Sequence, residues 1–401
     1  MKWTKQPLNK VADLCLGKML DEKKNKGQPL PYLANINVRW GTFDLDNLRE
    51  MRFEENELER YGLKYGDIVM CEGGEPGRCA IWKEAMPGMM IQKAIHRIRP
   101  HENLDFRYLY YDFLHKGRTG EFASMFTGAT IKHLPGQNLA KIEIAIPPLD
   151  IQRRIADILS AYDDLIENNR RRIDLLEQSA RMLYKEWFVT LRFPGHEHVK
   201  VKDGVPQGWE KKLIGDVCQT IGGGTPSTQK REFWDDGNII WVTPTDVTRN
   251  DCLALLDSEK KITEDGLRNS SAKLLPPDTI LMTSRASIGF FAMMDKEAST
   301  NQGFISIIPN DPVLKMYMLH NLIFRVEEIR SNAGGTTFKE ITKTRFRAMS
   351  ITIPPKHLLE QFEENVYAIL QQTRILKKQI KGLQQARDLL LPRLMNGEIP
   401  V

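Results

Sequence analysis

The sequence predicts a mixed α+β protein in which two α/β domains are joined by two long helices that form an antiparallel coiled coil. Two observations predict this fold class. A stretch of about 20 residues recurs roughly halfway along the 401-residue chain, and each copy leads into a long apolar pattern of helical period. If a pseudo-twofold axis relates the two copies, the helices run antiparallel.

The internal repeat is clearest near two Pro-Pro pairs. GATIKHLPGQNLAKIEIAIPP at 128–148 recurs as GTTFKEITKTRFRAMSITIPP at 335–355, so that Pro147 aligns with Pro354 at an offset of 207 residues. The same offset continues through both apolar patterns. Fainter matches lie upstream, namely Trp3 with Trp209, GDIVM at 66–70 with PDTILM at 277–282, and Gln92 near Gln302.

The repeat divides the chain into four segments. We expect globular domains at 1–147 and 209–353, a helical spacer with a linker at 148–208, and a C-terminal helical spacer at 354–401. KIEIAI and AMSITI alternate with period two and stop at a Pro-Pro pair, which is typical of a strand that leaves a domain.

Two helices are expected at 149–190 and 357–395, where apolar residues follow one another mostly at steps of three and four. Forty residues of helix would be roughly 60 Å long, so an isolated helix would leave its apolar stripe in water. The economical arrangement packs the two helices together as a coiled coil. The predicted packing residues are Ile155, Ile158, Tyr162, Leu165, Ile173, Leu176, Leu183, Phe362, Ile369, Leu376, Ile380, Leu383 and Leu390.

Composition excludes several classes of protein. The five cysteines include no CxxC pair, so a disulfide framework or a zinc site is not expected, and a reducing cytoplasm fits. The N-terminus lacks an apolar signal core, and no apolar run reaches the roughly 18 residues that a membrane helix needs. The net charge of +5 indicates nucleic-acid binding only weakly, because an ordinary surface can carry it.

Catalytic motifs are not found. The segments IPPL, LPPD and IPPK lack the acidic or amide residue before the prolines, and the aromatic residue after them, that an adenine methyltransferase needs. Gly222–Pro226 lacks the Gly-Lys-Ser/Thr of a phosphate loop, so we interpret it as a flexible loop or a structural turn. His196 and His198 lie in a polar linker without a third ligand nearby, and Asp163 looks like part of a solvated helix face. We expect no catalytic residue, metal site or cofactor in this chain.

The motifs around the helices resemble the specificity subunits of type I restriction–modification enzymes. They are IPPLDIQRRIADIL at 146–159, VPQGW at 205–209, IPPKHLLEQF at 353–362 and LLLPRLMNGEI at 389–399. The resemblance covers the whole chain, although the globular domains match only in their layout. The second copy departs slightly, with Glu360-Gln361 where the first has Gln152.

The resemblance implies a non-catalytic, DNA-reading subunit. Each globular domain would be a target recognition domain for one half of a split, asymmetric sequence in double-stranded DNA, and the helices would set the gap between the halves. Helices and flanking residues would dock two methyltransferase (modification) subunits, and motor–nuclease (restriction) subunits would complete the complex. S-adenosylmethionine, ATP and Mg²⁺ are expected only in those partner subunits, and no membrane is involved.

Candidate DNA contacts follow from side-chain chemistry, because Arg, Lys, Asn and Gln read base edges while Ser, Thr, Lys and backbone amides hold phosphates. Each candidate could instead be an ordinary loop residue. The candidates in the first domain are Gly73, Gly74, Arg78, Gln92, Lys93, Thr130 and Lys132. Those in the second are Gly223, Gly224, Lys230, Arg231, Ser284, Arg285, Asn301, Gln302, Thr336, Thr337 and Lys339.

Two other classes of function compete with this interpretation. A self-sufficient methyltransferase or nuclease is disfavoured by the missing motifs. A pure coiled-coil scaffold is disfavoured because a scaffold does not need two divergent globular domains. The DNA target itself cannot be derived from the sequence.

Overall fold

The computed structural model describes residues 3–21, 25–335 and 339–401, and the chain forms two compact units. The first unit combines Met1–Leu165 with Leu383–Val401, and the second is Ile166–Gly382. Each unit therefore contains one globular head and a segment of each long helix. We call residues 3–147 the first head and residues 209–353 the second head.

The first head is built on a four-stranded antiparallel sheet and a smaller three-stranded sheet. The larger sheet has the order β2 (Ala12–Leu16), β10 (Ile95–Pro100), β7 (Ile68–Cys71), β8 (Cys79–Ile81). The smaller sheet has the order β6 (Arg49–Phe53), β3 (Gln28–Leu33), β9 (Met90–Ile91). Two further pairs are β1 (Thr4–Pro7) with β11 (Glu143–Ile146) and β4 (Val38–Arg39) with β5 (Thr42–Phe43).

Helix α2 (Phe106–Thr119) packs on the larger sheet of the first head. The Asp105 carboxylate caps its first turn by accepting from the N–H groups of Arg107 and Tyr108, and Gly120 ends it with a φ of 77°. Leu109 and Phe113 of this helix belong to the same buried core as Ile68 of the sheet. The shorter helices are η1 (Leu8–Lys10), η2 (Asn35–Asn37), α1 (Glu55–Tyr61), η3 (Glu121–Met125) and α3 (Gly136–Leu139).

The second head repeats this plan. Its four-stranded sheet has the order β15 (Cys218–Gly222), β21 (Phe304–Pro309), β18 (Ile280–Thr283), β19 (Phe291–Met293). Its smaller sheet has the order β17 (Lys260–Ile262), β16 (Ile239–Val242), β20 (Ser299–Thr300), and β14 (Glu210–Leu213) pairs with β22 (Ser350–Ile353). The helices are α5 (Ile214–Val217), η6 (Arg231–Phe233), α6 (Pro244–Thr248), α7 (Glu264–Arg268), η7 (Pro312–Leu314), α8 (Lys315–Phe324), α9 (Val326–Ser331) and α10 (Lys343–Arg347).

Both heads therefore share one topology. In each smaller sheet the last strand runs parallel to the central strand, as β9 does to β3 and β20 to β16. In each head the strand before the Pro-Pro pair lies antiparallel to the first strand, with Thr4 opposite Ile146 and Glu210 opposite Ile353. The predicted internal repeat and the predicted α+β class are confirmed.

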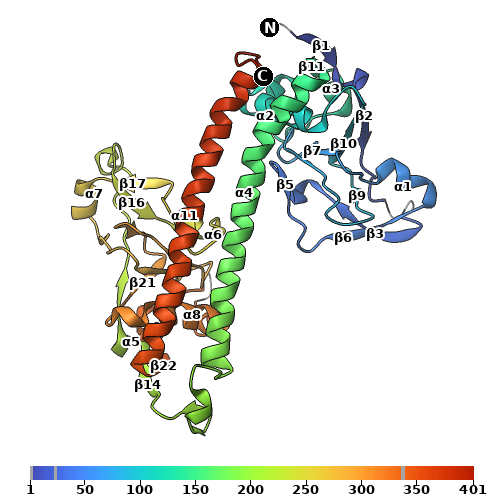
Figure 1. Cartoon of the computed structure of the whole chain (residues 1–401). Coiled ribbons are helices and arrows are strands. Elements are labelled where there is room, and N and C mark those ends of the chain that lie inside the picture. The colour runs from blue at the N-terminus through green and yellow to red at the C-terminus, as the bar shows by residue number, and fades with distance from the viewer. Residues whose placement is uncertain (1–2, 22–24, 336–338) are drawn as a thin grey trace. The chain divides into compact units, whose positions relative to one another are not determined.

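The two long helices are α4 (Leu149–Tyr184), which continues in a π-helical turn at Lys185–Val189, and α11 (Lys356–Met395) (Figure 1). Their segments run antiparallel in each unit. In the first unit Asp163 of α4 pairs with Arg387 of α11, and Ile155 shares a core with Leu394. In the second unit Asn169 bonds Gln379, whereas Tyr184, farther along α4, lies 6.2 Å from the Phe362 ring, which comes earlier in α11.

All but two of the predicted packing residues are buried or partly buried. Ile155, Ile173, Phe362, Leu376 and Ile380 are buried. Tyr162, Leu176, Leu183, Ile369, Leu383 and Leu390 are partly buried. Ile158 and Leu165 are 37% and 53% exposed, so their assignment to the seam was wrong. The buried face is centred near Leu159 instead. At about 100° per residue, Ile155, Ala156 and Ile166 lie within about 60° of Leu159 around the helix, whereas Ile158 and Leu165 lie about 100–120° from it.

The linker contains a 3₁₀ turn, η5 (His196–His198), and a hairpin of β12 (Val201–Lys202) and β13 (Val205–Pro206). None of the helices in the described ranges is both long enough and apolar enough to cross a membrane. Within the same ranges, no group of three or more His, Cys, Asp or Glu side chains is arranged to hold a metal ion.

Candidate nucleic-acid interface

One edge of the larger sheet in the second head collects most of the candidate residues of that head. Strands β15 and β18 both run antiparallel to β21, with Gly222 opposite Ile305 and Thr283 opposite Phe304. The carboxyl ends of β15 and β18 therefore meet the amino end of β21. We call the segments at this place, 223–225, 284–286, 300–303 and 339–341, the second loop edge.

Gly223, Gly224, Asn301 and Gln302 lie together at the second loop edge. The Gly224 N–H donates to the Thr300 carbonyl at 2.9 Å, and the Thr225 hydroxyl donates to Oε1 of Gln302 at 2.5 Å. A Cβ atom on Gly223 would lie 2.1 Å from the Asn301 carbonyl oxygen, so only glycine fits this close approach. The glycines shape the loop, and the Gln302 amide is exposed beside it.

Ser284, Arg285 and Lys339 belong to the same edge. The Ser284 N–H donates to the Gly303 carbonyl at 2.8 Å, and the Ala286 N–H donates to the Lys339 carbonyl at 3.0 Å. Ser284 is only 2% exposed, so it supports the loop from within and does not present a side chain. Arg285 and Lys339 are exposed, which leaves two cationic residues on the surface of this edge.

The other candidates of the second head lie elsewhere. Lys230 and Arg231 are exposed at the start of η6, where the Lys230 ammonium lies 4.9 Å from the centre of the Phe233 ring and 3.8 Å from the Glu232 carboxylate. Thr336 and Thr337 lie outside the described residues.

The first head has an equivalent edge, formed by segments 17–18, 72–78, 91–94 and 127–134. Lys18 and Gln92 form a parallel bridge, and the Lys93 N–H donates to the Lys18 carbonyl at 2.8 Å. The Gln92 N–H donates to the Leu33 carbonyl, and the Asn301 N–H donates to the Val242 carbonyl in the same way. Gln92 therefore corresponds to Asn301, which is one residue before the predicted match, Gln302. We call this place the first loop edge.

Gly73, Gly74 and Arg78 form the turn between β7 and β8 at the first loop edge. The guanidinium of Arg78 donates to the Asn35 carbonyl at 3.0 Å and pairs with Glu75, so it holds two loops together. Gly73 forms an antiparallel bridge with His133, which brings the hairpin 127–133 to this turn. Thr130 and Lys132 lie on that hairpin and are exposed.

Two further residues of the first loop edge, Gly17 and Lys18, were not among the candidates from the sequence. A Cβ atom on Gly17 would lie 2.4 Å from the Gln92 carbonyl carbon, the same restriction that Gly223 meets in the second head. The buried Lys18 ammonium donates to the Arg52 carbonyl at 2.9 Å and to Glu57 at 2.5 Å. Burial raises the pKa of the Glu57 carboxyl, but the hydrogen bond from Lys18 opposes this effect, and the pKa is lowered overall. Extending the repeat upstream from Trp3 and Trp209, at an offset of 206, would have placed Gly17 opposite Gly223.

The second head is attached to α11 by a network of charged groups. Asp278, in the turn before β18, pairs with the buried Arg374 of α11 at 2.7 Å and accepts from the Tyr367 hydroxyl at 2.7 Å. Burial raises the pKa of Asp278, but the Tyr367 and Arg374 bonds outweigh it and lower the pKa overall. Lys378 pairs with Asp295 at 2.5 Å one turn further along the helix.

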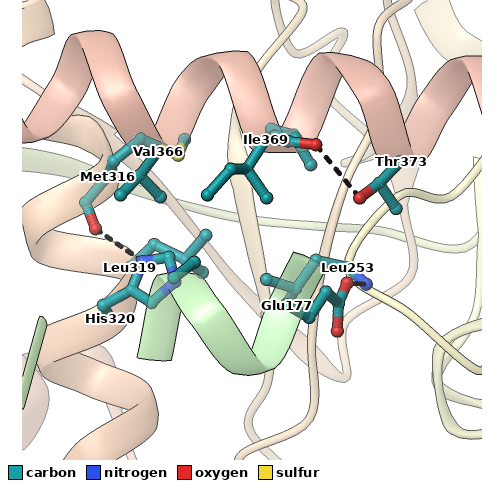
Figure 2. Close-up of a pocket in the computed structure, with 10 residues that line it drawn as sticks. Glu177, Leu253, Met316, Leu319, His320, Val366, Ile369 and Thr373 are labelled. Carbon is teal, nitrogen blue, oxygen red and sulfur yellow. Dashed lines mark hydrogen bonds between the residues drawn. The ribbon is translucent and has the colours of Figure 1, made fainter. Parts of the chain in front are cut away.

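Figure 2 shows a small cavity between α4, α8 and α11 in the second unit. Its polar lining includes Glu177, which accepts from the Leu253 N–H at 2.6 Å, and His320, whose Nδ1–H donates to the Met316 carbonyl at 2.9 Å. Burial lowers the pKa of His320 to about 4. With about 10 Å³ of free space, the cavity holds at most about one water molecule and is part of the packing, not a ligand site.

The first head meets α4 through a shared apolar core, one buried amide and a few hydrogen bonds. Gln152 of α4 is fully buried, accepts from the Asp105 N–H at 2.9 Å and donates to the Pro147 carbonyl at 2.8 Å. The Tyr111 hydroxyl donates to Asp163 at 2.7 Å. Asp163 therefore anchors Tyr111 and Arg387 and is not the solvated residue that the sequence suggested.

These loop edges offer chemistry for contact with a duplex, namely exposed lysine, arginine, glutamine and threonine side chains on loops held by a rigid sheet. The family model for the type I restriction modification DNA specificity domain matches residues 2–178 and again residues 206–383. The chain belongs to this family.

Relatives within the family align along nearly the whole chain. The type I restriction enzyme MjaIX specificity subunit of Methanocaldococcus jannaschii is 28% identical over 421 aligned residues, covering 100% of this chain and 94% of the relative. The type I restriction enzyme HindI specificity subunit of Haemophilus influenzae is 25% identical, and the alignment covers 84% of this chain and 87% of the relative. The crystal structure of the type I restriction–modification S subunit from M. genitalium shares the fold, with a TM-score of 0.59, 17% identity, and 98% and 96% of the two chains covered. The chain is thus a specificity component of a type I system, the kind of subunit that has no catalytic role.

Proposed function

We propose that the chain reads a bipartite DNA target, with residues 1–147 and 209–353 as two target recognition domains that each bind one half. The observation that carries this proposal is the repeated loop edge. Gly17 approaches the Gln92 carbonyl group in the first head as Gly223 approaches the Asn301 carbonyl oxygen in the second. The exposed loops around these two positions differ in sequence. Two heads with the same backbone arrangement but different exposed side chains would suit two different half-sites.

The exposed or partly exposed polar residues of the loop edges are the proposed DNA contacts. In the first head they are Gln92, Lys93, Thr130 and Lys132, with Gly73 and Gly74 offering backbone amides close to the duplex. In the second they are Arg285, Gln302 and Lys339, supported by Gly223, Gly224, Ser284 and Asn301. Arginine, lysine and glutamine can reach base edges in the major groove, and the hydroxyl groups and ammonium groups can hold phosphates. Lys230 and Arg231 would hold phosphates beside the site.

We propose that the two long helices, at 148–208 and 354–401 with their linker, set the gap between the half-sites. Their buried seams and the antiparallel pairing of their segments in each unit support a stiff spacer. Half-sites about one helical turn of DNA apart, roughly 34 Å, face the same side of the duplex.

The outer faces of the helices are the proposed docking sites for two methyltransferase subunits. In the second unit Leu175 and Met182 are exposed seven residues apart on α4. In the first unit Leu389 is exposed on α11, and the offset of 207 aligns it with Met182. Apolar residues at heptad spacing fit a helix of a partner protein. S-adenosylmethionine, and the ATP and Mg²⁺ of motor–nuclease subunits, would be bound by those partners in the cytoplasm.

The docking proposal can be tested separately from DNA reading. Met182→Glu and Leu389→Glu should each weaken co-purification of the methyltransferase subunits, because a charge replaces an apolar contact. Gln372→Glu, on an exposed polar position of α11, is the matched control. Retention of both partner subunits by the two variants would contradict the docking site.

A domain exchange tests the proposed function directly. The target is first determined by methylation-sensitive sequencing of DNA modified by the complete complex. Replacing residues 1–147 with the same block of another specificity subunit should change one half of the target and leave the other half intact. A change in both halves, or in neither, would overturn the division of labour.

The spacer role has its own test. Inserting seven residues in both helices lengthens each by about 10 Å, which corresponds to at most about three base pairs. We expect the gap to change while both half-sites stay the same. Altered half-sites with an unchanged gap would show that the helices do not set the spacing.

A further inference from the structure

The hairpin 127–133 carries an apolar residue at its exposed tip. Its base is closed by two hydrogen bonds, from the Thr127 N–H to the His133 carbonyl at 2.8 Å and from the His133 N–H to the Thr127 carbonyl at 2.9 Å. Gly128, with a φ of 93°, turns the chain so tightly that a Cβ atom would lie 2.2 Å from the Ile131 carbonyl oxygen. The Ile131 side chain is left 65% exposed.

A second exposed isoleucine lies in a segment that bonds the same turn of the first loop edge. Ile36 is 57% exposed, and the side-chain amide of its neighbour Asn35 donates to the Gly73 carbonyl at 3.3 Å. The hairpin meets Gly73 as well, through His133. Two large apolar side chains therefore stand exposed in the two segments that bond Gly73, although single exposed apolar residues are the ordinary case.

The residues around Ile131 fit a nucleic acid better than a protein. Thr130 and Lys132 flank it, both exposed, and Lys93 belongs to the same edge. A hydroxyl group and two ammonium groups suit phosphates, whereas protein-binding patches are depleted in lysine. Within DNA, the apolar group that a protein can touch from the major groove is the 5-methyl of thymine.

We propose that Ile131, with Ile36 beside the same turn, contacts the methyl group of a thymine in the half-site bound by the first head. This inference rests on the proposed function, under which the first head reads base edges of one half-site from the major groove. Any A·T pair in that half-site presents a thymine methyl group there. Phe338, which the sequence repeat aligns with Ile131, lies outside the described residues.

Replacing thymine with uracil tests the contact, because uracil pairs identically and lacks only the methyl group. The complex with its methyltransferase subunits is titrated with duplexes in which each thymine of the first half-site is changed in turn. We expect one replacement to lower affinity about fourfold, the worth of one buried methyl group. Ile131→Ala should bind the thymine duplex about fourfold more weakly and no longer distinguish it from that uracil duplex.

Three controls keep the result specific. Ile131→Leu retains an apolar side chain and should still distinguish thymine from uracil. Tyr65→Ala removes an exposed residue that precedes β7, at the opposite end of the sheet, and should behave like the unmodified chain. Uracil in the second half-site should affect Ile131→Ala and the unmodified chain equally.

The contrary outcomes separate this inference from the proposed function. If the complex binds its bipartite target but tolerates every uracil in the first half-site, the methyl contact is wrong and the function stands. If Ile131→Ala binds both the thymine duplex and the uracil duplex more weakly than the unmodified chain binds each of them, Ile131 contacts something other than the methyl group. If the complex shows no sequence preference at all, the proposed function fails with it.

Discussion

Arg374 and Leu394 hold comparable places in the two units, since each comes from α11 and each is buried in its own unit. Arg374 meets the Asp278 carboxylate of the second head, within a network that also includes Tyr367. Leu394 instead joins an apolar core with Ile155 of α4 and Phe113 of the first head. These two side chains of α11 are thus held by different chemistry, although the first unit also contains the bonds of Asp163 with Tyr111 and Arg387.

The difference teaches where each unit is sensitive to substitution. A buried ion pair is directional, and removing one partner leaves the other charge without compensation. An apolar contact is less directional and tolerates exchange between side chains of similar volume. The second unit should therefore respond to the loss of the Arg374 charge, whereas the site of Leu394 in the first unit should respond to changes of side-chain volume.

The largest effect is expected for Arg374→Met. The substitution removes the guanidinium partner of Asp278 but leaves it the Tyr367 hydroxyl and the Lys315 ammonium, 3.5 Å away. The free energy of unfolding of the second unit should therefore fall by about 3–4 kcal/mol, in the lower part of the range for a broken buried ion pair. Denaturant unfolding, followed by fluorescence, measures the change. Lys356→Met is the matched control, because Lys356 and Asp311 are exposed and 3.8 Å apart, and its effect should not exceed about 1 kcal/mol. Equal effects of the two substitutions would contradict the comparison.

Acid should destabilise the second unit through His320. Its pKa is lowered to about 4 by burial, whereas in the unfolded chain it returns to about 6.5, so the unfolded state binds the proton first. Protonation of His320 therefore has no effect on stability well above pH 6.5. As the pH falls from 6.5 to 4, it lowers the free energy of unfolding by about 3 kcal/mol. Unfolding measured from pH 7 to pH 4 should show a shallower loss for His320→Phe. Parallel curves for the variant and the unmodified chain would refute this assignment.

Gly17→Ala and Gly223→Ala test the feature that the two heads share. Each new methyl group would overlap backbone atoms, at 2.4 Å in the first head and 2.1 Å in the second, and should cost about 1–3 kcal/mol. Methylation of the two half-sites measures the functional consequence, with each variant relaxing only its own half. Gly382→Ala, at a position with no atom within 4 Å, is the control. Loss of both half-sites in either variant would argue against independent heads.

The smallest effect is expected for Asp157→Asn in the first unit. Asp157 pairs with Arg107 at 2.6 Å, but its side chain is 63% exposed and Arg107 keeps its other partner, Asp105, at 3.2 Å, so the change should cost less than about 1 kcal/mol. Unfolding of the first unit measures it. A loss as large as that expected for Arg374→Met would show that the first head also depends on charge.

The helices were predictable because their signals are local. Apolar steps of three and four residues indicate a helix wherever they occur, and both long helices were placed within a few residues of their ends. The phase of the seam was harder to predict. The small Ala156 and the polar Asp163 lie on the buried side of α4, while the larger Ile158 and Leu165 lie outside it, so apolar size misled the assignment.

The loop edges were only partly predictable, because they join segments that are far apart in sequence. Gly223 and Asn301 were both candidates, but only the antiparallel register of β15 and β21 shows that they touch. Lys18 gave no local signal, since its role depends on Glu57 and on the carbonyl of Arg52. Arg78 had the right chemistry for a base contact, yet its guanidinium is used within the head.

The division of the first unit into Met1–Leu165 and Leu383–Val401 has a consequence for the order in which the chain is made. Leu391, Leu394 and Met395 belong to the core of the first head, so that core lacks three apolar side chains while the second unit is being synthesised. At about 5–20 residues per second, the wait lasts about 10–40 s. The head that emerges from the ribosome first is therefore the one completed last, and a chain that ends early would leave its core open to water.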